Sequence, residues 1–123
     1  MCIFYGFIPQ KSSSQEVSTK DSLIWVSMDS LVNHYADYGL YDSAIITGKK
    51  SINFSKKIFG IKHSCYAQSL CSISLVYIYQ EEYAVAETLL KKAVEVYKKA
   101  VGINHVDYAA GLSYLAILYN SWG

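Results

Sequence analysis

The sequence contains no arginine: all eleven of its basic Lys and Arg residues are lysines, in a chain of 123 residues. The chain therefore lacks the planar guanidinium group that best binds carboxylate, phosphate or guanine through two parallel hydrogen bonds. Its formal net charge of +1 gives no general attraction to nucleic acid or to an anionic membrane. We therefore expect neither a nucleic-acid nor a membrane partner.

Cysteines and long apolar runs are also scarce. The three cysteines, Cys2, Cys65 and Cys71, form no C-x-x-C pair, so the sequence predicts neither a disulfide framework nor a zinc site. A reducing, cytoplasmic location is the simpler interpretation. No apolar run reaches the roughly 18 residues that a membrane-spanning helix needs. The apolar start, residues 1–9, is short and has no basic residue before it, so it does not resemble a secretory signal.

Catalytic motifs are missing as well. The sequence has no Ser-His-Asp order, no nucleotide-binding glycine loop and no H-E-x-x-H pair. We therefore expect no catalytic activity, no cofactor and no bound metal.

An internal repeat dominates what is present. Residues 60–77 return as residues 102–119, with identical Gly, Ile, His, Tyr, Ala and Leu and an identical closing Tyr. A fainter copy precedes them within residues 18–59. A period of 42 residues is typical of stacked helical repeats, and 52% apolar with 17% charged residues is typical of a packed chain.

Apolar residues spaced by three and four positions predict five helices. We expect them at 22–38, from Asp42 to 59, at 64–80, at 83–100 and at 106–122. The short connections make neighbouring helices antiparallel. The sequence thus predicts an all-α chain with a flexible segment at 1–20 and repeats at 21–60, 61–102 and 103–123, the last one incomplete.

Polar residues and glycines set the expected helix ends. Asp21 and Asp42 are predicted N-caps of the first two helices. Gly39, Gly60 and Gly102 are predicted to end helices as C′ glycines. Gly48 lies inside the second helix, where we expect it to interrupt the helix at a cost of about 1 kcal/mol relative to alanine.

The spacing of small and aromatic residues, Ile73-Ser74…Tyr77…Tyr83…Ala86…Ala93, resembles the tetratricopeptide repeat. The 42-residue period and the Gly-x-x-His link before each Tyr-Ala resemble its kinesin light chain-type subfamily. The resemblance implies a superhelix of αα-hairpins, about two and a half repeats here. It also implies a protein-interaction scaffold whose concave groove binds a peptide or a partner helix.

The same resemblance implies which side chains line the groove, one set from the first helix of each repeat. These sets contain two carboxylates and no cation, so we expect a neutral or basic ligand with apolar anchors, and no clamp for a terminal carboxylate. The predicted groove residues are Asp29, Ser30, Asn33 and Asp37 in the first repeat, Cys71, Ser72, Leu75 and Ile78 in the second, and Ser113, Tyr114, Ile117 and Asn120 in the third.

Histidines and lysine pairs leave alternatives open. His63 and His105 lie one period apart, each just before a helix, and we interpret them as caps or linker residues. Lysine pairs recur seven positions apart, at 49/50 and 56/57 and at 91/92 and 98/99. They form either a basic band for RNA or membrane or, the interpretation we prefer, a solvated outer surface.

Two further alternatives concern the function itself. The chain could be the N-terminal regulatory arm of a larger signalling or protease protein, here truncated. Exposed apolar side chains on the incomplete third repeat also make self-association through the last helix an alternative.

Overall fold

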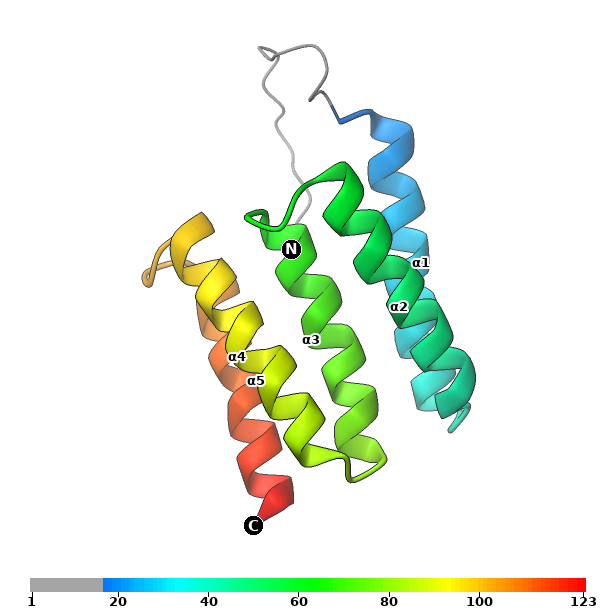
Figure 1. Cartoon of the computed structure of the whole chain (residues 1–123), viewed down its shortest axis with the longest axis vertical. Coiled ribbons are helices and arrows are strands. Elements are labelled where there is room, and N and C mark those ends of the chain that lie inside the picture. Colours follow the sequence, from blue (N-terminus) through cyan, green and yellow to red (C-terminus); the bar gives the residue numbers. More distant parts are fainter. Residues whose placement is uncertain (1–16) are drawn as a thin grey trace.

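The computed structural model describes residues 17–123, and over this range the chain forms five α-helices (Figure 1). The helices are α1 (Thr19–Asp37), α2 (Tyr41–Ile58), α3 (Ser64–Tyr79), α4 (Tyr83–Ala100) and α5 (Val106–Trp122). The predicted all-α class is thus confirmed. The predicted flexible segment comprises residues 1–20, and its residues 1–16 lie outside the described residues. Residues 19 and 20 already belong to α1.

The helices form two layers. In the first layer α1 contacts α3 and α3 contacts α5, so these three helices lie side by side. In the second layer α2 packs against α1 and α3, and α4 packs against α3 and α5, while α2 and α4 have no contact. Figure 1 views the molecule from the side of α2 and α4, with α1 and α5 behind them. Each helix pair therefore buries its apolar side only against its neighbours.

Three helices end at the predicted glycines. Gly39, Gly60 and Gly102 follow α1, α2 and α4 with φ angles of 74°, 96° and 89°, in the left-handed region that glycine adopts without steric cost. After α3 the same conformation falls on Glu81, whose φ is 63°. A residue with a Cβ adopts this conformation less readily, so the turn between α3 and α4 is the more strained connection.

The first two helix starts differ from the prediction. α1 begins earlier, because the side chain of Ser18 is the N-cap and accepts the backbone N–H of Asp21 at 3.0 Å. α2 begins at Tyr41, and its N-cap residue Leu40 makes no side-chain capping bond. Asp42 therefore lies in the first turn, where its charge still favours the helix dipole.

Gly48 does not interrupt α2, which is continuous from Tyr41 to Ile58. The glycine is buried against α3, and a Cβ at this position would lie 2.9 Å from both Cγ1 and Cδ1 of Ile73. Such a distance is shorter than any ordinary carbon contact, so the absence of a side chain permits the close approach of α2 and α3. Gly48, which was expected to interrupt the helix, is thus a packing contact between α2 and α3.

The core lies between the layers. Its largest cluster joins α3, α4 and α5 through residues such as Leu70, Leu90 and Leu118. A polar bridge connects α1, α3 and α2: Trp25 Nε1–H donates to Ser69 Oγ at 2.7 Å, and Ser69 Oγ lies 3.0 Å from Ser51 Oγ. Because all three side chains are buried, these bonds satisfy groups that water cannot reach.

Candidate functional site

Each helix of the first layer carries a stripe of side chains, spaced by three and four residues, on the side that α2 and α4 leave uncovered. The 42-residue repeat aligns the three stripes into rows that cross the layer. Most of these side chains are exposed or half-buried, and Ser72 in the centre is buried. We call this surface the α1–α3–α5 face, and it consists of Val26, Ser30, Asn33 and Asp37, then Gln68, Ser72, Leu75 and Tyr79, then Ala110, Tyr114, Ile117 and Ser121.

The structure corrects two of the predicted groove residues. Cys71 and Ile78 are buried in the cluster between α3, α4 and α5 and expose almost no surface, so they are packing residues of the core. Their places in the stripe belong to Gln68 and Tyr79, and of these two only Gln68 was not expected from the sequence as a contact residue. Gln68 is the only long polar side chain in α3, a helix without a charged residue, and this was the signal that could have revealed it.

The other predicted residues fall into three groups. Seven lie in the stripes of the α1–α3–α5 face, where ligand contact stays a prediction. Ser113 and Asn120 are exposed beside the stripe of α5. Asp29 lies beneath the face. The seven are Ser30, Asn33, Asp37, Ser72, Leu75, Tyr114 and Ile117.

Asp29 is the unusual group of this region, because only 8% of its surface is exposed. Its Oδ2 atom accepts one hydrogen bond, from Nε2 of Gln68, at the long distance of 3.5 Å. Within residues 17–123 its Oδ1 atom, also buried, has no hydrogen-bond partner, and neither has Oγ of Ser72. The carboxyl is thus buried with less than half of its hydrogen-bonding capacity used.

Two side chains from other helices complete the surroundings of Asp29. The hydroxyl of Tyr97 on α4 donates to Oε1 of Gln68 at 3.2 Å, and this bond turns the amide N–H group of Gln68 toward the carboxyl. Tyr114 on α5 is half-buried and near enough for the Asp29 carboxylate to raise the pKa of its phenol, after the larger effect of burial. Residues from α1, α3 and α5 therefore converge at one place.

Burial raises the pKa of Asp29 from 3.8 to about 6, because the charged form loses its hydration. Ser72 and Gln68 lower this pKa only in part. The Ser72 hydroxyl is close enough to exert this effect, although its Oγ makes no bond of regular distance and angle. Near neutral pH the carboxyl is therefore ionised, buried and poorly compensated.

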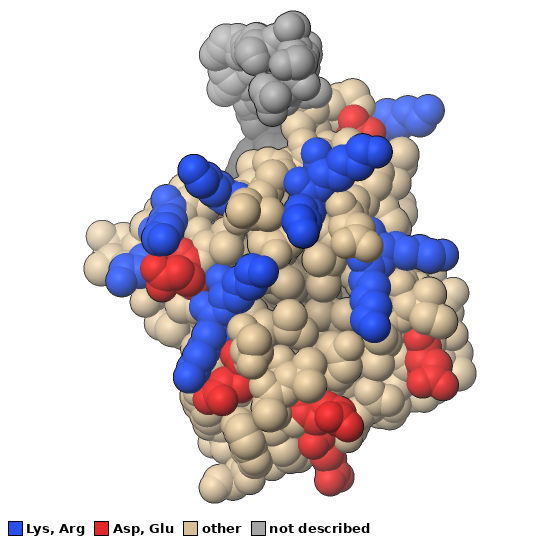
Figure 2. Space-filling model, in the orientation of Figure 1, with Lys and Arg blue, Asp and Glu red and all other residues tan. Residues whose placement is uncertain are grey.

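Charge is divided between the two layers. Helices α1, α3 and α5 together contain four aspartates and one lysine, whereas α2 and α4 contain eight lysines, two glutamates and one aspartate. Figure 2 shows the lysines gathered over the α2–α4 side of the molecule. Two of them form ion pairs along the surface of α4, Lys91 with Glu87 at 3.5 Å and Lys99 with Glu95 at 3.9 Å. The α1–α3–α5 face is the more acidic side.

The repeated histidines are helix caps, as the sequence predicted. Nδ1 of His63 accepts the backbone N–H of Cys65, and Nδ1 of His105 accepts that of Asp107, both at 3.0 Å. Only a neutral imidazole nitrogen can accept a hydrogen bond, and burial lowers the pKa of His63, which favours this form. These histidines therefore stabilise α3 and α5.

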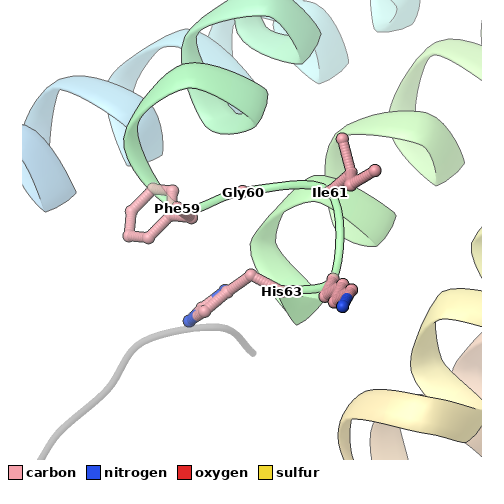
Figure 3. A pocket seen from close by; sticks show the side chains of 5 residues that line it. Phe59, Gly60, Ile61 and His63 are labelled. Atoms are coloured by element: carbon pink, nitrogen blue, oxygen red, sulfur yellow. The ribbon is translucent and has the colours of Figure 1, made fainter. Parts of the chain in front are cut away.

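A shallow pocket lies at the loop between α2 and α3. Its lining is residues 59–63. Figure 3 shows the rings of Phe59 and His63 extending to the same side of the loop, with Ile61 on the other side. The two ring centroids are 4.9 Å apart. Since His63 already caps α3, this pocket is part of the linker.

Residues 17–123 contain no group of three or more His, Cys, Asp or Glu side chains that could hold a metal ion. Over the same range, no helix combines the length and the apolar character that crossing a membrane requires.

A sequence model of the tetratricopeptide repeat family matches residues 24–99, which is more than half of the chain. The chain belongs to the tetratricopeptide repeat family. The match spans α1 to α4 almost completely, and the helix pairs described above give it the repeat's αα-hairpin architecture. No curated protein matches the sequence. Tetratricopeptide repeats are generally protein-interaction modules.

Proposed function

We propose that this protein is a non-catalytic interaction scaffold that binds an extended peptide or a partner helix on its α1–α3–α5 face. The observation that carries the proposal is the row of apolar side chains left uncovered on this face. Leu75 on α3 is half-buried, and its repeat equivalent on α5, Ile117, is 42% exposed; Tyr79, one turn after Leu75, is 45% exposed. Apolar side chains surrounded by polar ones are typical of a protein-binding patch.

Acidic residues support a neutral or basic partner. Asp37 is exposed on the face and Asp29 lies beneath it, while the described lysines are mostly on the opposite layer. This arrangement disfavours an acidic peptide and gives nucleic acid no basic surface on this side. The lysines of α2 and α4 are then a solvated outer surface.

The test is a peptide-binding measurement with one apolar position changed. A fluorescently labelled peptide is selected from a random library on immobilised protein, and its affinity is measured for the wild type and for Ile117→Ser. We expect the substitution to weaken binding by roughly tenfold, because burial of one large aliphatic side chain contributes about 1.5–3 kcal/mol. Ile103→Ser is the matched control, since Ile103 is exposed in a linker away from the face.

Equal affinities of all three proteins would place the binding surface elsewhere. A library that yields no binding peptide at all would refute the proposed function.

The subfamily, too, is part of the proposal: we assign the repeats to the kinesin light chain type. The 42-residue period supports this assignment, since each period ends in the same linker, with a left-handed glycine followed three residues later by a capping histidine. We also propose a reducing, cytoplasmic location, which is the simpler interpretation of three cysteines without a C-x-x-C pair.

A second proposal concerns α5, which lacks the cover that α4 gives to α3. Leu70 of α3 is 2% exposed, whereas its repeat equivalent on α5, Leu112, is 43% exposed. We propose that two copies associate through this side of α5. In sedimentation velocity the wild type would show a concentration-dependent dimer, and Leu112→Lys would be a monomer. A wild type that stays monomeric at high concentration would refute self-association.

The same side of α5 is also where a following helix would pack if the chain is the regulatory arm of a larger protein. Sequencing of the messenger RNA beyond the codon for Gly123 tests this alternative. An open reading frame with a further Gly-x-x-His linker would support it.

A further inference from the structure

We propose that the α1–α3–α5 face contains a recognition site for a cationic side chain, an arginine or lysine of the bound peptide, with the carboxyl of Asp29 as its counter-charge. The inference rests on the proposed function, because it assigns the chemistry that this face selects. Ser72 provides a further acceptor at the same site, and Tyr114 is near enough for the charge of Asp29 to affect its phenol.

The first argument is the unused hydrogen-bonding capacity. Ser72 is 2% exposed and Asp29 is 8% exposed. Even so, Ser72 Oγ and Asp29 Oδ1 have no hydrogen-bond partner among the described residues. Leaving a buried polar atom unpaired costs free energy, and native structures contain few such atoms. The Ser72 hydroxyl lies close enough to Asp29 to lower the pKa of its carboxyl, but the two groups form no regular hydrogen bond, so Oδ1 keeps the capacity to accept a bond from an external group.

The second argument is the type of atom. An ionised carboxylate only accepts hydrogen bonds, and the hydroxyls of Ser72 and Tyr114 can accept as well. A ligand group with several N–H donors and a positive charge satisfies all of them. A guanidinium has five such donors in one plane and an ammonium has three. Since residues 1–123 contain no arginine, a guanidinium at this site would come from outside this sequence.

The third argument is that no cation of the described chain takes this place. The only lysine in α1, α3 and α5 is Lys20, nine residues before Asp29 and therefore about 13 Å away along the helix. The lysines of α2 and α4 lie on the opposite side of the molecule (Figure 2). The carboxyl is thus without a partner of opposite charge.

Access to the carboxyl leads past Gln68. Its side chain is half-buried in the face, and its bond to the carboxyl is long at 3.5 Å. A hydrogen bond of this length is weak, but Gln68 is also held by the bond from Tyr97 at 3.2 Å. A ligand group therefore reaches the carboxyl when it takes over the place of Gln68 as donor.

The experiment compares matched peptides on matched variants. Peptides are acetylated at the N-terminus and amidated at the C-terminus, so that no terminal charge contributes. A positional library is selected on the wild type, and each basic position of the best binder is replaced by citrulline, which keeps the shape of arginine without its charge. Affinities are then measured for the wild type, for Asp29→Asn and for the control Asp37→Asn, which removes an exposed carboxylate of the same face.

We expect the wild type to select arginine or lysine at one position and to bind the citrulline peptide at least roughly tenfold more weakly, as for a close charge pair. Asp29→Asn should bind the arginine peptide more weakly than the wild type by the same factor. Replacing the arginine by citrulline should not weaken its binding further. Asp37→Asn should still bind the arginine peptide more tightly than the citrulline peptide.

Three outcomes overturn the proposal in distinguishable ways. Peptides that bind without any preference for a basic residue refute the cationic site and leave the scaffold function intact. Equal discrimination by wild type and Asp29→Asn shows that a general surface charge, and not Asp29, attracts the ligand. An absence of peptide binding refutes the scaffold function and the site together.

Discussion

Asp29 should destabilise the folded protein near neutral pH, and replacing it by asparagine should therefore stabilise it. Asparagine has nearly the same shape and can still bond to Gln68, but it carries no charge that must be stripped of water. The change thus isolates the cost of burying the carboxylate. Since Asp29 is only 8% exposed, solvent screens this cost little.

The size of the effect follows from the pKa. Burial raises the pKa of Asp29 from 3.8 to about 6, and each unit corresponds to about 1.36 kcal/mol. Because the folded protein binds the proton more tightly, the contribution of Asp29 to stability is fully present below pH 3.8 and is lost as the pH rises through about 6. The free energy of unfolding of Asp29→Asn, relative to the wild type, should therefore increase by up to about 3 kcal/mol between pH 4 and pH 8.

Urea unfolding followed by tryptophan fluorescence measures this difference, since Trp25 is buried in the fold and becomes exposed on unfolding. The comparison is made at several pH values from about 4 to 8 with Asp37→Asn as control. Asp37 is exposed, and its variant should differ from the wild type by the same small amount throughout. A constant difference between Asp29→Asn and the wild type across the range would refute the reasoning.

Three further substitutions test the packing. Gly48→Ala should lower the urea midpoint, because the new Cβ would meet Ile73 at 2.9 Å. This loss is expected although alanine is the better helix former by about 1 kcal/mol. Adding Ile73→Val should restore part of the lost stability. Ser69→Ala should cost about 1–3 kcal/mol in urea unfolding, since Trp25 Nε1–H loses its buried acceptor, and a neutral result would contradict this. His63→Ala should lose about 1 kcal/mol of capping above pH 6.5. Burial lowers the pKa of His63, so this contribution disappears as the pH falls below 6.5, and thermal melts of the variant and wild type should converge in acid.

Local patterns predicted the architecture because the information is local. The period of 42 residues, the left-handed glycines and the capping histidines all act within a few residues of the position they define. The bounds predicted for α4 and α5 are confirmed. The start of α1 was missed, because Ser18 and Asp21 are both good capping residues and local chemistry does not choose between them.

Contacts between distant residues could not be predicted in the same way. Gly48 looks like a flaw in a helix until Ile73, 25 positions later, is seen against it. Assigning Cys71 and Ile78 to the groove placed two core residues on the surface, since in an apolar helix the covered side depends on the crossing of its neighbours. The burial of Asp29 likewise results from how α1 lies against α3, which no short segment encodes.

The predicted effects of Asp29 on folding and on binding have opposite signs, and this opposition separates two explanations of the residue. If Asp29 had no part in recognition, Asp29→Asn would still be the more stable protein near neutral pH, but it would bind a basic peptide as tightly as the wild type. If it serves recognition, Asp29→Asn is the more stable protein near neutral pH and the weaker binder of a basic peptide. A buried charge that costs stability is expected to persist where a ligand supplies its partner. Measuring both quantities on one variant therefore decides whether the carboxyl belongs to the binding surface.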